Sequence, residues 1–255
     1  MDKGRIASKD YETAYIESTL VGIQKLRNSL VTQIAHNFRT PLTSVIGFAE
    51  MLLDDRPLTD EQRVEYARFI HYEGIRLSKL IDDVLELSFL ERGNCPLKLE
   101  NQTLQDVVAE AISKIAAFAR GRFVAVKQIH GRPVVLPLDR AKIIQATYQL
   151  LHNAVRFTMP HHNVEVNVKT IGDWAEIKVQ DGGPGIPEEE IPLLIERIGR
   201  VYTQEQDGQS TGVGLTIVKH IMDLHRGEIQ IQSKLGEGSL FTLRIPGLEE
   251  LTPRN

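Results

Sequence analysis

A histidine in the stretch "TQIAHNFRTPLTS", residues 32–44, is the first residue whose type and setting could support chemistry. At about 100° per residue, His36 lies about 200° from Ile34 and about 160° from Phe38, so it is predicted to face solvent from an amphipathic helix. A neutral imidazole nitrogen exposed in this way can act as a nucleophile, although an exposed histidine without a task is the commoner case. Asn37 follows directly, and its amide can accept a hydrogen bond from the ring but cannot act as a carboxylate base.

Two glycine-rich stretches could hold a ligand. "DGGPGIP" begins at Asp181, directly after an alternating strand, and "STGVGLTIVK" begins at Ser210 and opens a helix. Glycines let the backbone approach a ligand, and the free N–H groups at a helix start favour a phosphate. Asp181, at the base of the first loop, could accept a hydrogen bond from an exocyclic amine. Taken alone, such a loop is more often only a turn, and Ile217 excludes a dinucleotide G-x-G-x-x-G motif in the second stretch.

A polar amide near the end of a long amphipathic helix is the third candidate. Asn153 stands in "LLHNAVRFT", with Arg156 about one turn further along, near enough to serve the same phosphates. By itself, such an amide is more commonly solvated or part of a helix cap.

The first part of the chain has the pattern of two long helices. Residues 11–36 have alternating steps of four and three between seam positions, which predicts a coiled-coil seam; these positions are Ile16, Leu20, Ile23, Arg27, Leu30 and Ile34. "TDEQ", residues 59–62, has the form of a capping box and predicts the start of a second helix, which ends near "ERGNCP". Because two helices bury their seams poorly alone, a dimeric four-helix bundle is expected.

From Leu97 onward, short alternating runs are interspersed with helical patterns, which predicts an α+β sandwich with a mixed sheet and helices on one face. The glycine-rich polar stretch around residues 182–214 is long for a compact domain, and a stretch of this kind is usually functional.

Composition excludes several other classes. The formal net charge is −4 and the basic residues are scattered, so nucleic acid is not expected as a direct partner. Cys95 is the only cysteine, and no Cys/His set has zinc spacing, which is typical of a reducing compartment and favours the cytoplasm. No apolar run approaches the roughly 20 residues of a membrane-spanning helix, so no direct membrane insertion is expected.

In this order, the motifs resemble those of two-component sensor histidine kinases. "HNFRTPLTSVIGFAEML" resembles the family's H box, "DRAKIIQATYQLLHNAVRFT" its N box, and the two glycine stretches its glycine boxes. The resemblance implies a helical hairpin for dimerisation and histidine phosphotransfer, followed by an ATP-binding domain of the gyrase-B type. It also implies three divisions: 1–30 as a coiled-coil signalling helix, 31–95 as the hairpin, and 96–248 as the ATP-binding domain.

The resemblance further implies the chemistry and its residues. His36 would take the γ-phosphoryl group of Mg-ATP and pass it to an aspartate of a response regulator, with an upstream sensor as a further partner. Asn153 would hold the magnesium ion, Asp181 would bind the adenine amine, and Thr40 would help to dephosphorylate the regulator. The remaining implied site residues are Asn37, Arg39, Arg156, Phe157, Gly183, Gly185, Ile186, Thr211, Gly212 and Gly214.

Several positions depart from the family pattern. Asn37 stands where the family usually has Glu or Asp, and loss of a general base commonly lowers a rate by about 10²–10⁴. Gln149 replaces the glutamate that activates water in ATP-hydrolysing relatives, which favours phosphotransfer over hydrolysis. Ile195 and Ile198 stand where the family usually has phenylalanines, so docking of the nucleotide lid is expected to differ. An alternative to a working kinase is therefore a nucleotide-binding signalling module with little autokinase activity.

Overall fold

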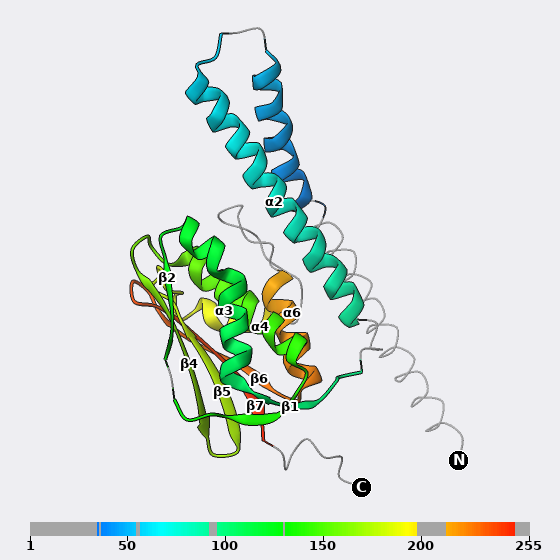
Figure 1. The fold of residues 1–255 in the computed structure, drawn as a ribbon, viewed down its shortest axis with the longest axis vertical. Coiled ribbons are helices and arrows are strands. Elements are labelled where there is room, and N and C mark those ends of the chain that lie inside the picture. The colour runs from blue at the N-terminus through cyan, green and yellow to red at the C-terminus, as the bar shows by residue number, and fades with distance from the viewer. Residues whose placement is uncertain are drawn as a thin grey trace, which may run out of the picture. The chain divides into compact units, whose positions relative to one another are not determined.

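The computed structural model describes residues 35, 37–54, 57–91, 96–129, 131–197 and 213–247. The chain divides near Asp83 into a helical unit and a larger unit of strands and helices (Figure 1). His36 and the coiled-coil seam predicted within residues 11–36, apart from Ala35, lie outside the described residues.

The helical unit contains the predicted hairpin. Residues 37–53 are helical, and α2 covers Asp60–Glu91, of which the residues from Asp83 onward belong to the larger unit. Phe48 of the first helix stacks on Phe69 of α2, with ring centroids 4.6 Å apart and planes 6° from parallel. Such an aromatic pair buries a large apolar area and fastens the two helices to each other.

A reciprocal pair of hydrogen bonds begins α2. The Thr59 backbone N–H donates to Gln62 Oε1 over 3.0 Å, and the Gln62 N–H donates to Thr59 Oγ1 over 3.2 Å. Two backbone donors that the helix itself cannot satisfy are thereby paired. The predicted capping box is confirmed.

The larger unit contains a five-stranded mixed sheet in the order β2-β4-β5-β7-β6, in which β2 and β4 are parallel and the other neighbours antiparallel. Its elements are β1 (Glu100–Thr103), α3 (Leu104–Gly121), β2 (Ala125–Ile129), β3 (Val135–Leu138), α4 (Arg140–Phe157), β4 (Asn163–Ile171), β5 (Trp174–Gln180), α5 (Glu190–Arg197), α6 (Val213–Leu224), β6 (Glu228–Lys234) and β7 (Gly238–Pro246).

One face of the sheet is covered by α3, α4 and α6 (Figure 1). Alternate residues of the strands point into this layer: Val164, Val166 and Val168 of β4 are all at most 2% exposed. The helices meet them with apolar stripes, such as Val107, Ala111 and Ile115 of α3. The predicted α+β fold with helices on one face is confirmed.

The first strand differs from the sequence expectation. The alternating pattern starts at Leu97, whereas β1 begins only at Glu100 and pairs with β3 in a separate two-stranded sheet. Lys98 is instead held at the start of α4, because its backbone N–H donates to Asp139 Oδ2 over 3.0 Å.

A buried histidine ties the end of α6 to the start of α4. His225 is fully buried; its Nδ1 lies 2.8 Å from the Ile221 carbonyl oxygen, and its Nε2 accepts the Asp139 backbone N–H over 3.1 Å. A carbonyl can only accept, so Nδ1 carries the proton and the ring is neutral. Burial lowers the pKa of His225, in agreement with this neutral form. Asp139 itself caps α4 by accepting the Lys142 N–H.

Candidate functional site

Asp181, the residue after β5, forms the base of the candidate site. Its side chain is buried, and Oδ1 accepts backbone N–H groups from Gly183 over 2.9 Å and from Ser239 over 3.1 Å. Burial raises the pKa of Asp181, and these two N–H groups oppose the rise. No described residue donates a hydrogen bond to Oδ2. The carboxylate is therefore fixed through one oxygen, and the other is available to a ligand that carries an N–H donor.

The loop that follows Asp181 needs glycine at two positions. A Cβ at Gly183 would lie 3.0 Å from the Phe157 carbonyl oxygen and 2.9 Å from Asp181 Oδ1. Gly185 has a φ of +72°, and a Cβ there would lie 2.1 Å from the Lys234 carbonyl oxygen. The glycines thus allow the loop to pass closely between the end of α4 and the β6–β7 hairpin.

Both neighbouring segments also hold the loop by hydrogen bonds. The Gly182 N–H donates to Thr158 Oγ1 over 3.1 Å, and the Ile186 N–H donates to Ser233 Oγ over 2.8 Å. The Gly236 N–H donates back to the Pro184 carbonyl over 2.7 Å. Thr158 and Ser233 were missed by the sequence reasoning, because a hydroxyl in a strand or at a helix end has no spacing pattern of its own.

The last turns of α4 present the predicted phosphate-side residues. Asn153 is half-buried, and its side chain has no hydrogen-bond partner among the described residues. The Arg156 guanidinium lies over the Phe157 ring, 4.7 Å from its centroid, and the Phe157 side chain is 45% exposed. The guanidinium covers one face of the ring, and the exposed part of the ring could lie against a flat base.

The Asn153 side chain suits a magnesium ion that is also bound by the phosphates of a nucleotide. The described residues contain no group of three or more His, Cys, Asp or Glu that could hold a metal ion. Magnesium is usually bound through one or two protein oxygens together with substrate phosphates and waters. The unpaired amide oxygen of Asn153 fits such a role.

Gln149, one turn before Asn153 on α4, bonds to Asp83 through its amide nitrogen, and its amide oxygen lies close to Gly214. Its Nε2 donates to Asp83 Oδ1 over 2.7 Å, and both residues are buried. A Cβ at Gly214, in the first turn of α6, would lie 3.0 Å from Gln149 Oε1. Gln149 therefore fills the space between α4 and the first turn of α6. Its side-chain amide cannot take a proton from water.

The structure gathers Asp181, Gly183, Gly185, Ile186 and Phe157 around one loop. In the helical unit, Asn37 is buried, whereas Arg39 and Thr40 are exposed. Ile195 of α5 is half-exposed. Ile198, Thr211 and Gly212 lie outside the described residues, as does His36.

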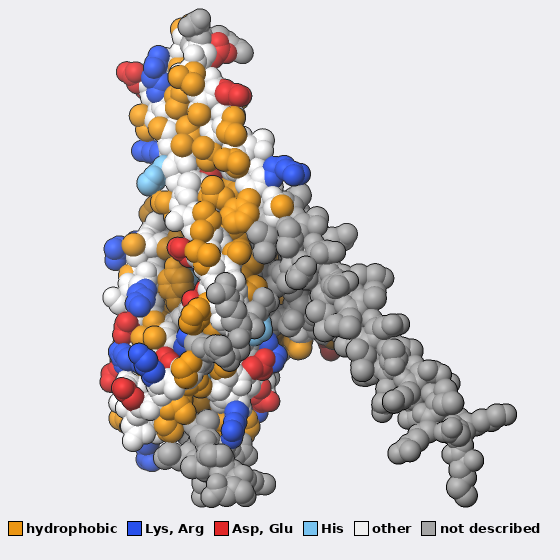
Figure 2. Space-filling model, turned by 90° about the vertical axis from the view of Figure 1, so that its right-hand side faces the viewer, with side chains coloured by type: hydrophobic (Ala, Val, Ile, Leu, Met, Phe, Trp, Pro, Cys, Tyr) orange, Lys and Arg blue, Asp and Glu red, His pale blue; other side chains and the backbone are white. Residues whose placement is uncertain are grey.

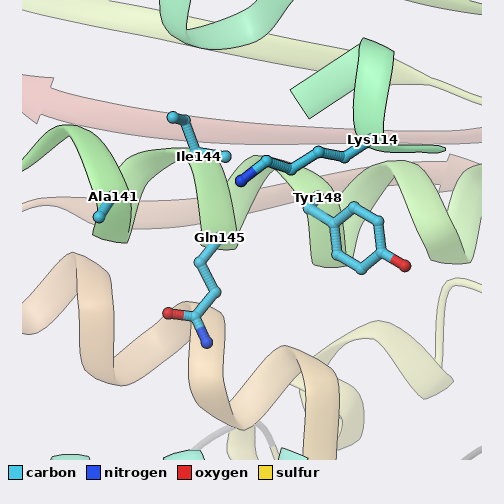
Figure 3. Close-up of a pocket in the computed structure, with 5 residues that line it drawn as sticks. All are labelled: Lys114, Ala141, Ile144, Gln145 and Tyr148. Carbon is cyan, nitrogen blue, oxygen red and sulfur yellow. The ribbon is translucent and has the colours of Figure 1, made fainter. Parts of the chain in front are cut away.

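A shallow pocket of about 360 Å³ lies between α3 and α4. Figure 3 shows Lys114 of α3 reaching toward the α4 side chains that line it. Its lining residues are Lys114, Ala141, Ile144, Gln145 and Tyr148. None of these is a predicted nucleotide-binding residue, so the pocket is separate from the glycine-loop site.

Two family models match the chain. Residues 26–93 match the His Kinase A (phospho-acceptor) domain, and residues 138–249 match the histidine kinase-, DNA gyrase B-, and HSP90-like ATPase. A helical hairpin followed by this ATPase fold, with a carboxylate under a glycine loop, defines the class of histidine kinase catalytic cores. The chain belongs to the two-component sensor histidine kinases, and it carries their catalytic core.

Curated relatives agree with this assignment. The chain is 36% identical over 238 residues to the circadian input-output histidine kinase CikA of Synechococcus elongatus, covering 89% of this chain and 31% of the relative. It is 28% identical to the non-motile and phage-resistance protein of Caulobacter vibrioides, covering 94% of this chain and 29% of that protein. The chain thus spans about a third of the length of these relatives.

Solved structures share the fold. The histidine kinase ThkA, in complex with the response regulator protein TrrA, aligns with 95% of this chain and 67% of its own at a TM-score of 0.69 and 21% identity. Histidine kinase AdeS of Acinetobacter baumannii aligns with 83% of this chain and 97% of its own at a TM-score of 0.61 and 22% identity. In the described part of this chain, no helix is long and apolar enough to cross a membrane.

Proposed function

We propose that this chain autophosphorylates on His36 with Mg-ATP and passes the phosphoryl group to an aspartate of a response regulator. The observation that carries the proposal is Asp181, whose Oδ1 is saturated by two backbone N–H groups while Oδ2 is available to an adenine amine. The phospho-acceptor model supports it, because the matched range contains His36.

In the proposed reaction, a neutral ring nitrogen of His36 attacks the γ-phosphorus. A P–N bond forms, the bond from phosphorus to the β–γ bridging oxygen breaks, and ADP leaves. The Asn37 amide oxygen would accept a hydrogen bond from Nδ1–H and hold the ring in one tautomer. The regulator's aspartate would then attack the phosphorus and break the P–N bond. Thr40 would support the reverse task of dephosphorylating the regulator.

The nucleotide would lie between α4, the first glycine loop and the start of α6. Asn153 would hold magnesium, Arg156 would lie near the phosphates, and Phe157 would pack on the adenine side. The ion would neutralise charge on the phosphates, and the residues around it would position the γ-phosphoryl group. Further contacts would come from Arg39, Gly183, Gly185, Ile186, Thr211, Gly212 and Gly214.

We also propose the division and partners of the chain: 1–30 as a signalling coiled coil, 31–95 as the dimerising hairpin, and 96–248 as the ATP-binding domain. Apolar side chains exposed along α2, including Tyr72 at 52% and Ile75 at 58%, would be covered by a second copy. Hydrophobic side chains gather along one face of the helical hairpin (Figure 2). The response regulator's receiver domain and an upstream sensor are the other partners, in the cytoplasm, where ATP and regulators meet.

The second candidate function is a nucleotide-binding signalling module with little autokinase activity. Asn37 favours it, because an amide cannot serve as the base that an acidic residue would provide. In this case, ATP would still bind at Asp181 and change the conformation or docking of the chain.

Incubation with γ-labelled ATP and magnesium separates the two functions. An acid-labile, base-stable label that is absent from His36→Gln supports the kinase. A matched control is His71→Gln, which removes an exposed histidine of α2 and should leave the label unchanged. ATP binding without any label supports the module, and absence of ATP binding contradicts both.

A further inference from the structure

Two serines of the β6–β7 hairpin lie beside the carboxylate of the proposed adenine site. Ser233 and Ser239 are cross-strand partners. They share a face with the next pair, Ile231 and Phe241, which is buried under the helices. Both hydroxyls therefore lie on the side of the sheet that carries the nucleotide-binding elements.

Ser233 uses its complete hydrogen-bonding capacity. Its Oγ accepts the Ile186 N–H over 2.8 Å, lies 2.9 Å from the Gly238 carbonyl oxygen, and lies 2.9 Å from Ser239 Oγ. The carbonyl can only accept, so the single Ser233 proton is donated to Gly238. The contact between the two hydroxyls then requires Ser239 to be the donor.

The proton assignment fixes what Ser239 can offer to a ligand. Its hydroxyl donates its proton to Ser233 Oγ, and its backbone N–H donates to Asp181 Oδ1. No described residue donates a hydrogen bond to Asp181 Oδ2 or, with this proton assignment, to Ser239 Oγ, so both oxygens remain available as acceptors. An amino group suits this pair, whereas a carbonyl in the same place would face only acceptors.

We infer that Ser233 is a positioning residue that makes the site select a 6-amino purine over a 6-oxo purine. It does so by orienting the Ser239 hydroxyl and by clamping the first glycine loop through Ile186. The inference rests on the proposed nucleotide binding and adds to it the origin of base selectivity. Asp181 supplies a charged acceptor for the amino group. Ser233 accepts the Ser239 hydroxyl proton, which could otherwise be donated to a 6-oxo group.

The test compares the affinities of ATP and inosine triphosphate, which differ at C6 and in the N1 proton, by calorimetry on the purified chain. In Ser233→Ala, the Ser239 hydroxyl becomes free to donate to the 6-oxo group, so the preference for ATP should fall by about tenfold. Ser233→Thr keeps a hydroxyl and should restore the preference. Gln232→Ala removes the exposed neighbour on the opposite face of the strand and should leave it unchanged.

A nucleotide-free measurement tests the clamp separately. Hydrogen exchange at the Ile186 amide should be faster in Ser233→Ala than in wild type and in Gln232→Ala. Equal loss of affinity for both nucleotides, with an unchanged ratio, overturns the orienting role; unchanged exchange overturns the clamp. Wild type that binds neither nucleotide overturns the proposed function, and with it the selectivity, while the exchange result still reports on the clamp.

Discussion

At the scale of single residues, the buried Asp181 carboxylate lowers the stability of the free protein but provides an acceptor for a ligand. Its carboxylate is buried, and its raised pKa means that the ionised form is disfavoured in the free folded protein. Because the folded-state pKa is raised, ionisation of Asp181 costs stability as the pH rises through that pKa. A ligand amine that donates to Oδ2 would offset this cost.

Asp181→Asn should therefore separate the two properties. The amide oxygen can still accept the Gly183 and Ser239 N–H groups, so the free protein should be at least as stable as wild type at neutral pH. ATP affinity should fall by about 1.5–3 kcal/mol, because a charged hydrogen bond is lost and an N–H now faces the amine. Urea unfolding and calorimetry measure the two effects. A variant that is destabilised yet binds ATP normally would contradict this role.

Asn37 offers a second test at this scale. Asn37→Asp keeps the side-chain volume at this buried position while it restores a group that can take a proton. Labelling from γ-labelled ATP should become faster by about 10²-fold or more, as expected when a general base is restored. His36→Gln in the same background should abolish the label. An increase below threefold would show that Asn37 does not limit the rate.

The sequence predicted those site residues whose chemistry has a local pattern. Asp181 and the glycines of its loop follow a strand, and Asn153 closes an amphipathic helix, so both were visible as spacing. Ser233 and Thr158 were not, because their roles come from segments brought together only by the fold. Arg156 was assigned to phosphates, and its guanidinium lies over the Phe157 ring in the free chain.

At the scale of elements, His225 joins α6 to α4 and should make the larger unit sensitive to acid. Its pKa is lowered by burial, so below about pH 6.5 the unfolded chain binds a proton that the folded chain does not. This contribution to stability is complete above that pH and declines as the pH falls toward the folded-state pKa.

His225→Leu should cost about 1–3 kcal/mol at neutral pH, because the Asp139 N–H and the Ile221 carbonyl lose their partner in a buried place. The variant should also lose the part of the acid sensitivity that His225 contributes. Urea unfolding as a function of pH measures both, with the exposed His71→Ala as control. An unchanged pH profile in His225→Leu would refute this account.

Element starts were predictable wherever a cap specifies them, as Thr59 and Gln62 do for α2. The pairing between strands was not predictable, because the alternating pattern of one strand does not indicate which other strand lies beside it. The short β1–β3 sheet shows this: Glu100 pairs with Leu138 across the whole length of α3 and β2, and no local feature of either strand indicates the other.

At the scale of the whole molecule, the order of the motifs predicted two units with separate tasks. The hairpin supplies the proposed acceptor and the larger unit the proposed nucleotide site, so binding and phosphorylation can be disrupted independently. The chain covers about a third of the length of its curated relatives.

The apolar surface of α2 carries the last prediction, which is dimerisation. Ile75 is 58% exposed near the middle of α2, and covering its apolar side chain with a second chain would stabilise a dimer. Ile75→Asp would place a charge in that interface, so the protein should sediment as a monomer at concentrations where wild type is a dimer. Leu235→Asp, at a similarly exposed position in the β6–β7 turn, is the matched control and should remain dimeric. Because the nucleotide site lies in the other unit, Ile75→Asp should keep its ATP affinity; a dimeric Ile75→Asp would place the interface elsewhere.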